Sequence, residues 1–220
     1  MEEFLIIGGG IGGLSLALGL QRIGRKVAVL ERTDTFTDVG AGLTVGPNMM
    51  HALAWLGVAE DTLRNAMIPE HGGVVDMATG ELRVSNRRGS GPLERYGQPY
   101  AQMHRADMQR ILLEAVRRND PDALRPGHAI TGISEAPGSV TAHFANGRSV
   151  QGQWLIGADG IRSVVRDLVF PGNEPVFTGY VAWRGLVPME RLGHVPIYPD
   201  SAILIGPRRS LARYRVRNGQ

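Results

Sequence analysis

The sequence contains no cysteine, which excludes disulfides, thiol nucleophiles and cysteine-ligated zinc. Its six histidines are scattered and form no short-spaced pair of the kind that binds metal ions: His51, His71, His104, His128, His143 and His194. We therefore predict no metal site. A chain without cysteine is compatible with a reducing compartment, and we expect a cytoplasmic location.

Long hydrophobic runs and a strong charge imbalance are also missing. No stretch reaches the ~18 apolar residues of a membrane span, and the acidic pair Glu2 and Glu3 before the first apolar run is unlike the basic flank of a signal peptide. The net charge is +3, from 24 basic and 21 acidic residues, without a dense basic block. We predict no nucleic-acid partner and no stable membrane insertion.

Glycine is concentrated near the start of the chain, between an apolar run and a helical pattern. Phe4–Ile7 has the character of a short buried strand, a helical pattern begins near Leu14 and ends at Gly24, and Lys26–Leu30 is a second apolar strand. The pattern predicts a βαβ unit with five glycines among residues 8–13 at its first turn.

The G-x-G-x-x-G spacing is matched by Gly8, Gly10 and Gly13, between a strand and a helix, which is the context that makes this motif informative. Gly12 is a further residue without a side chain in the same turn. In such a turn the first glycine permits the tight bend, the second admits a pyrophosphate, and the third lets the helix pack closely. Glu31, eighteen residues after Gly13, is placed to bind an adenosine ribose and would repel a 2′-phosphate. The turn predicts bound FAD or NAD, and the glycines alone do not separate the two.

The rest of the chain alternates between helical and strand patterns. We expect two helices within 46–63 interrupted at Gly57, and a hairpin over 72–88. An amphipathic helix is expected over 105–119, and short strands over 130–150 with a turn at 145–148. Further alternating strands are expected from Thr178 onward, with Trp183 in a core.

Five stretches together resemble the class A flavoprotein monooxygenases, of the p-hydroxybenzoate and salicylate hydroxylase type. They are "GGGIGG" with Glu31, "GAGLTVGPN" at 40–48, "HRADMQRILLEA" at 104–115, "GADGIRSVVR" at 157–166 and "GYVAWRGLVP" at 179–188. The resemblance implies an α/β fold: a Rossmann-like FAD-binding domain (GR2-type) with a second antiparallel-sheet substrate domain, truncated at the C-terminus. It implies FAD-binding segments 1–70 and 101–174 and substrate-domain segments 71–100 and 175–220.

The resemblance also implies cofactor-binding residues beyond the glycine turn. The pair matching Asp159 and Gly160 lies near the flavin and the transient nicotinamide cofactor, and the arginine matching Arg105 contacts the phosphate and ribityl region. The resemblance also implies roles for Arg32, for Thr44 and for the strand backbone near Ile130, which faces the adenine. All three are carried over by motif position, and the last two matches are less specific than the first. The alternative interpretations are a simple turn at Asp159 and an ordinary helix start at Arg105.

In that family NADPH or NADH reduces the flavin, and oxygen from O2 is then transferred to a small aromatic substrate. The polar candidates for the substrate side are Arg184, Arg209 and Tyr214, because an arginine binds an anionic group through two hydrogen bonds and a tyrosine can donate to a ring oxygen. Ordinary surface exposure is the alternative for both arginines.

One departure from the family is that this chain has no Gly-Asp dipeptide of the kind that closes over the flavin. We expect a piece of a longer protein, a truncated product or a chain completed by a homo-oligomer or a second polypeptide. The alternatives are a non-catalytic FAD-binding fragment and another flavoprotein oxidoreductase with the same nucleotide domain. An NAD-dependent dehydrogenase is a further alternative.

Overall fold

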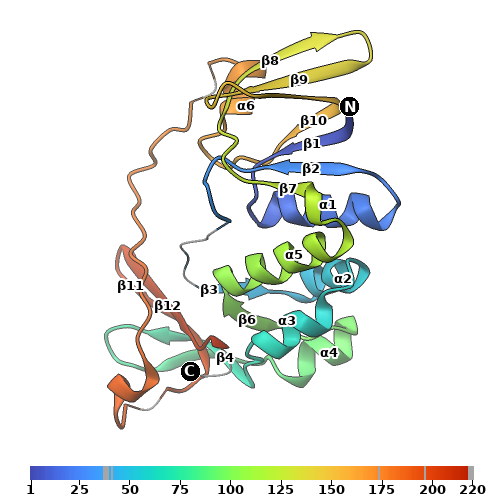
Figure 1. The fold of residues 1–220 in the computed structure, drawn as a ribbon. Helices are drawn as coiled ribbons and strands as arrows, with labels where there is room; N and C mark the ends of the chain where they lie inside the picture. The colour runs from blue at the N-terminus through green and yellow to red at the C-terminus, as the bar shows by residue number, and fades with distance from the viewer. Residues whose placement is uncertain (37–39, 41, 173, 196, 218–220) are drawn as a thin grey trace. The chain divides into compact units, whose positions relative to one another are not determined.

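The computed structural model describes residues 1–36, 40, 42–172, 174–195 and 197–217. The chain forms two compact units, Met1–Asp38 with Gln109–Ala182 and Val39–Met108 with Trp183–Gln220 (Figure 1). These units are defined by contacts alone, and the division into FAD-binding and substrate segments given above remains a prediction.

The first unit is built on a six-stranded sheet of order β7-β2-β1-β10-β9-β8, in which β7, β2, β1 and β10 are parallel and the last three strands form an antiparallel meander. Its elements are β1 (Glu2–Ile7), α1 (Ile11–Arg22), β2 (Val27–Leu30), α5 (Arg105–Asn119, from Gln109 onward), the 3-10 turn η1 (Pro121–Ala123), β7 (Leu124–Arg125), β8 (Ile130–Ala136), β9 (Ser139–Phe144), β10 (Ser149–Gly157) and α6 (Val164–Val169). The predicted βαβ unit is confirmed.

The two faces of the parallel strands are covered by different elements. On one face, Ile6 of β1 lies under α1, and Gln21 of α1 donates to the Val116 carbonyl of α5 at 3.3 Å. On the other face Leu5, Ile7 and neighbouring apolar residues pack against the meander and Val165 of α6. Burial on both faces explains the nearly continuous apolar sequence of β1 and β2, which carry no alternating polar residues.

The second unit contains two small sheets and three short helices. A two-stranded antiparallel sheet pairs β3 with β6, and a four-stranded sheet has the order β12-β11-β4-β5, in which only the β11–β4 pairing is parallel. The elements are β3 (Gly42–Val45), α2 (Pro47–Trp55), α3 (Ala59–Asn65), β4 (His71–Asp76), β5 (Leu82–Arg87), α4 (Ser90–Tyr96), β6 (Ala101–His104), the 3-10 turn η2 (Met189–Leu192), β11 (Ser201–Gly206) and β12 (Arg209–Tyr214).

A buried side-chain hydrogen bond connects the two sheets of the second unit. Gln102 of β6 donates from Nε2 to Oγ of Ser201 on β11 at 2.8 Å. Both residues are buried, and burying a polar side chain is favourable only when it is paired. The bond therefore joins the β3–β6 pair to β11, an inner strand of the larger sheet.

The expected strand around 180–187 does not form. The described residues between 174 and 188 contain no helix or strand, and Trp183 is 94% exposed, so the prediction of a core tryptophan was wrong. Alternation of apolar and polar residues indicates a strand only where a neighbouring strand offers its hydrogen-bonding edge. By contrast, the hairpin predicted over 72–88 is present as β4 and β5.

Candidate functional site

Two glycines of the first turn are required by the backbone conformation and packing of the turn, whether or not a ligand is bound. Gly8 has φ +113°, a conformation that side chains rarely adopt, and a Cβ there would lie 2.5 Å from the Ala158 carbonyl oxygen. A Cβ on Gly13 would overlap the carbonyl oxygen of Gly8. These positions are therefore glycine because the turn is tight and α1 packs directly on it.

Gly9 is covered by side chains from elsewhere in the unit. Its missing Cβ would lie 2.5 Å from Cδ1 of Phe36 and 3.2 Å from a carboxylate oxygen of Glu31. Its N–H donates to Glu31 at 2.7 Å, and its carbonyl accepts from Nε2 of Gln109 at 2.9 Å. The turn is thus held by α5 and by the segment after β2.

Gly10 and Gly12 differ from these three glycines, because a Cβ on either would meet nothing within 4 Å. Gly10 is the N-cap of α1, in an extended conformation with φ −75° and ψ 179°, so its backbone would accept other residues. Neither the conformation of Gly10 nor the packing around it explains the glycine. An absent side chain that leaves open space beside backbone N–H groups is what a closely approaching pyrophosphate requires.

The start of α1 offers an anion its hydrogen-bond donors. No side chain caps the helix, and its first turn contains no acidic residue. Among the described residues, no acceptor pairs with the N–H groups of Ile11, Gly12 and Gly13. Free amides at the positive end of a helix dipole form a favourable phosphate site.

Glu31 stands at the tip of β2, beside this turn. Its two carboxylate oxygens accept from the Gly9 N–H at 2.7 Å and from the N–H and hydroxyl of Thr33, each at 3.0 Å. A carboxylate has about four acceptor positions, so one remains for a ribose hydroxyl. The residues present therefore fit the adenosine diphosphate part of FAD.

The segment leading to Ile130 lies beside the residues that follow β2. The His128 N–H donates to the Glu31 carbonyl at 2.7 Å, and Gly127 donates to Thr33 at 2.9 Å. Ile130 itself is buried in the core, and Arg32 is exposed next to Glu31. The structure thus brings Glu31, Arg32 and the approach to Ile130 to one end of the sheet.

A second glycine turn follows β10, the strand next to β1. Asp159 lies against Gly8, since a Cβ on Gly8 would be 3.0 Å from the Asp159 Cα. Its carboxylate accepts from the N–H groups of Val164 and Val165 at 2.7 and 3.1 Å and from the Ser163 hydroxyl. Gly160 follows with φ +85°. The Asp159 side chain therefore caps α6, and its backbone borders the first turn.

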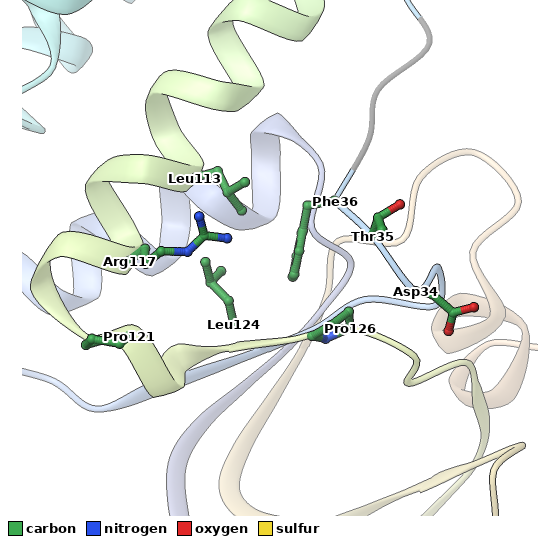
Figure 2. A pocket seen from close by; sticks show the side chains of 8 residues that line it. All are labelled: Asp34, Thr35, Phe36, Leu113, Arg117, Pro121, Leu124 and Pro126. Carbon is green, nitrogen blue, oxygen red and sulfur yellow. The ribbon is translucent and has the colours of Figure 1, made fainter.

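A cavity of about 440 Å³ is lined by Phe36, the residue whose ring also lies against Gly9. Figure 2 shows Phe36 and Arg117 extending into the same space. The lining residues are Asp34, Thr35 and Phe36 after β2, Leu113 and Arg117 of α5, Pro121 of η1, and Leu124 and Pro126 around β7. The Phe36 ring therefore borders both this cavity and Gly9.

Two cofactor residues implied by the resemblance belong to the second unit. Arg105 is the first residue of α5, with Gly40 against its side chain. Thr44 lies on β3, and its hydroxyl accepts from Tyr100 at 3.3 Å. Their role toward FAD remains a prediction.

The three substrate-side candidates have different surroundings in the second unit. Tyr214 is half-buried with its ring against Gly42, and burial raises the pKa of its phenol, while the nearby charge of Arg184 lowers that pKa in part. Arg184 is exposed. Arg209 is exposed at the start of β12, and because side chains alternate along a strand it lies on the opposite face from Tyr214. The charge of Arg184 thus acts on the Tyr214 phenol, whereas Arg209 lies on the other face of β12.

Three residues that shape these sites were missed by the sequence analysis: Phe36, Gln102 and Gln109. Gln109 is only 7% exposed and bonds to Gly9, a hundred residues away in sequence. A glutamine beside the apolar stripe of an amphipathic helix was the available signal. Phe36 and Gln102 gave none, because their partners are distant in sequence.

Within the part of the chain that the structure describes, no group of three or more His, Asp or Glu side chains could hold a metal ion. In the same residues no helix is long and apolar enough to cross a bilayer.

Comparisons with known proteins point to the same cofactor. A profile of the family described as "FAD binding domain" matches residues 2–183. The chain is 35% identical over 216 residues to a 3-hydroxybenzoate 6-hydroxylase of Polaromonas naphthalenivorans, covering 98% of this chain and 54% of the relative. It is also 35% identical over 211 residues to the 3-amino-4-hydroxybenzoate 2-monooxygenase PtmB3 of Streptomyces platensis, covering 96% and 52%.

The fold is similar to the crystal structure of a variant of HpxO from Klebsiella pneumoniae complexed with FAD, with a TM-score of 0.79 and 25% identity over all of this chain and 55% of that chain. The chain spans about half the length of the curated relatives it matches. Because the family match covers most of its residues, the chain belongs to the FAD binding domain family.

Proposed function

We propose that this chain is the FAD-binding part of a monooxygenase that hydroxylates a small aromatic compound, phenolic or carboxylated, with NAD(P)H and O2. The observation that carries the proposal is the open backbone at Gly10 and Gly12, at the uncapped start of α1 and beside Glu31. FAD, when bound, supplies the redox chemistry and the activation of oxygen. The chain supplies binding, orientation and electrostatics.

The adenosine diphosphate part of the cofactor would be held by the first unit. The first amides of α1 would bind the pyrophosphate, and Glu31 would accept a hydrogen bond from the ribose. A carboxylate at that position repels a 2′-phosphate. This repulsion disfavours NADP as the resident dinucleotide, and the match to the FAD binding domain family supports FAD over NAD. NADH or NADPH would then act as a transient reductant.

The reaction we propose converts an aromatic C–H to C–OH. One atom of O2 enters the ring and the other leaves as water, while NAD(P)H gives up a hydride and a solvent proton balances the reaction. An oxygen substituent makes the ring electron-rich, and the Tyr214 phenol can donate a hydrogen bond to that oxygen. Arg184 and Arg209 are the candidates for binding a substrate carboxylate.

A non-catalytic FAD-binding chain is the second candidate. It is favoured by the length comparison, since the chain spans only 54% of the hydroxylase from Polaromonas. A homo-oligomer or a separate polypeptide could complete the site. We place the protein in the cytoplasm because its sequence has no cysteine.

The test is a titration of the purified chain with FAD, followed by flavin fluorescence, and then an assay of NADH and NADPH oxidation. In the assay 3-hydroxybenzoate is compared with benzoate, which lacks the ring oxygen. Oxidation of NADH or NADPH that is stimulated by 3-hydroxybenzoate and not by benzoate supports the monooxygenase. FAD binding without stimulation supports the non-catalytic alternative, and failure to bind FAD contradicts both.

A further inference from the structure

The phenol of Tyr214 lies directly over Gly42 in the second unit. A Cβ built on Gly42 would be 2.8 Å from Oη and 2.9 Å from Cζ of Tyr214, and would overlap Cε2. Distances below 3.0 Å are essentially never seen for real Cβ atoms. The hydroxyl end of the ring thus occupies the space that any side chain at position 42 would need.

The backbone of Gly42 does not itself require glycine. Gly42 is not among the glycines with positive φ, and it pairs with His104 in a regular antiparallel ladder. Alanine would be accepted in such a strand without backbone strain. The three atoms nearest to a Cβ at this position all belong to the Tyr214 ring, so the ring is what a side chain would meet first.

Neighbouring residues hold the two strands in this relation. Thr44 on β3 pairs with Gln102 on β6, and Tyr214 on β12 pairs with Ser201 on β11. The buried bond between Gln102 and Ser201 joins the partner strand of Gly42 to the partner strand of Tyr214. The hydrogen bond between Gln102 and Ser201 thus helps to hold Gly42 and Tyr214 in contact.

The hydrogen-bonding state of the Tyr214 hydroxyl bears on its possible role. Among the residues that the structure describes, none is hydrogen-bonded to its Oη. The ring is half-buried, and burial raises the pKa of the phenol. A neutral phenol with an unused proton can donate to an acceptor that approaches it.

We infer that Gly42 is a positioning residue: its lack of a side chain seats the phenol of Tyr214 against β3, with its hydroxyl available to the oxygen of an aromatic ligand. The inference rests on the proposed function only for the identity of that ligand. This packing of the Tyr214 ring on Gly42, called the seat below, is a property of the chain and can be measured without substrate.

The experiment uses the whole 220-residue chain with carbon-13 at the tyrosine ring, and Tyr214→Phe assigns one of the five tyrosine signals. In Gly42→Ala the added methyl displaces the ring, so the Tyr214 signal moves and its pKa falls toward that of an exposed tyrosine. The melting temperature falls by about 2–8 °C. Gly91→Ala is the matched control, since Gly91 has open space around it, and it should leave the Tyr214 signal unchanged.

A rescue distinguishes positioning from general damage. In a Tyr214→Ala background the ring is gone, so adding Gly42→Ala should cause no further loss of melting temperature. If Gly42→Ala fails to fold and the double variant folds, the inference is supported. An unchanged Tyr214 signal in Gly42→Ala, or an equal loss with and without the ring, would overturn it.

The same samples separate this inference from the proposed function. If the wild-type chain fails to bind FAD but shows the Tyr214 shift and the rescue, the proposed function fails and the seat remains. If FAD binds but neither the Tyr214 shift nor the rescue is seen, the inference about Gly42 is overturned and the proposed function is not.

Discussion

The first unit contains two strand-to-helix turns of the same design, side by side, that use their helices differently. After β1 the glycine turn leads into α1, whose first amides have no capping side chain. After β10 the turn leads into α6, where Ser163 and Asp159 accept hydrogen bonds from the first amides. Adjacent parallel strands therefore end in one open helix start and one satisfied helix start.

The difference indicates where an anionic ligand binds. Unpaired amides at a helix start must find an acceptor, whereas capped ones already have it. Gly10 and Gly12 also leave open space at the first turn. The pyrophosphate of FAD is therefore expected at α1, and Asp159 contributes chiefly by holding the second turn against Gly8.

The largest expected effect is on the turn itself. Gly13→Ala places a methyl group on the Gly8 carbonyl oxygen, and we expect a loss of about 3 kcal/mol in the free energy of unfolding, measured with urea. Gly12→Ala is the control in the same helix. It should gain about 0.5–1 kcal/mol, because alanine replaces glycine where nothing is in the way. Equal losses would show that packing does not distinguish these glycines.

Gly10→Ala should affect ligand binding more than stability. Its methyl group enters the space assigned to the pyrophosphate, so the dissociation constant for FAD should rise by about tenfold or more, which is about 1.4 kcal/mol. The free energy of unfolding without FAD should fall by less than about 1 kcal/mol, the cost of a poorer N-cap. Unchanged FAD affinity with a large loss of stability would reverse the interpretation of this glycine.

Substitutions in the second turn should lower the free energy of unfolding. Asp159→Ala removes acceptors from two backbone amides and the Ser163 hydroxyl, and we expect a loss of about 1 kcal/mol in the free energy of unfolding without FAD. Ser163→Ala, which removes the cap of a single amide at 3.0 Å, is the graded control. Full stability of Asp159→Ala together with lost FAD binding would show that the carboxylate serves the cofactor directly.

The βαβ unit could be predicted because its signals are local. Apolar strands, glycine spacing and Glu31 all lie within the first 31 residues, and the observed strand and helix bounds agree with the pattern. The hairpins could be predicted for the same reason, since turns such as 145–148 determine which strands pair.

The rest depends on contacts between distant residues. Phe36 and Gln109 meet at Gly9 only after the fold is complete, and the position of Gln109 beside an apolar helix stripe does not identify its partner. The alternation around Trp183 was wrongly interpreted as a strand because strand formation needs a partner edge. The seat of Tyr214 on Gly42 joins residues 172 positions apart, so the glycine alone gave no indication of it.

The most direct test of the open helix start is a nitrogen-15 NMR titration of the chain with FAD. We predict that the amide signals of Ile11, Gly12 and Gly13 show the largest shifts, while those of Val164 and Val165 change little. Large shifts at α6 with none at α1 would contradict the assignment of the cofactor phosphates to the first turn.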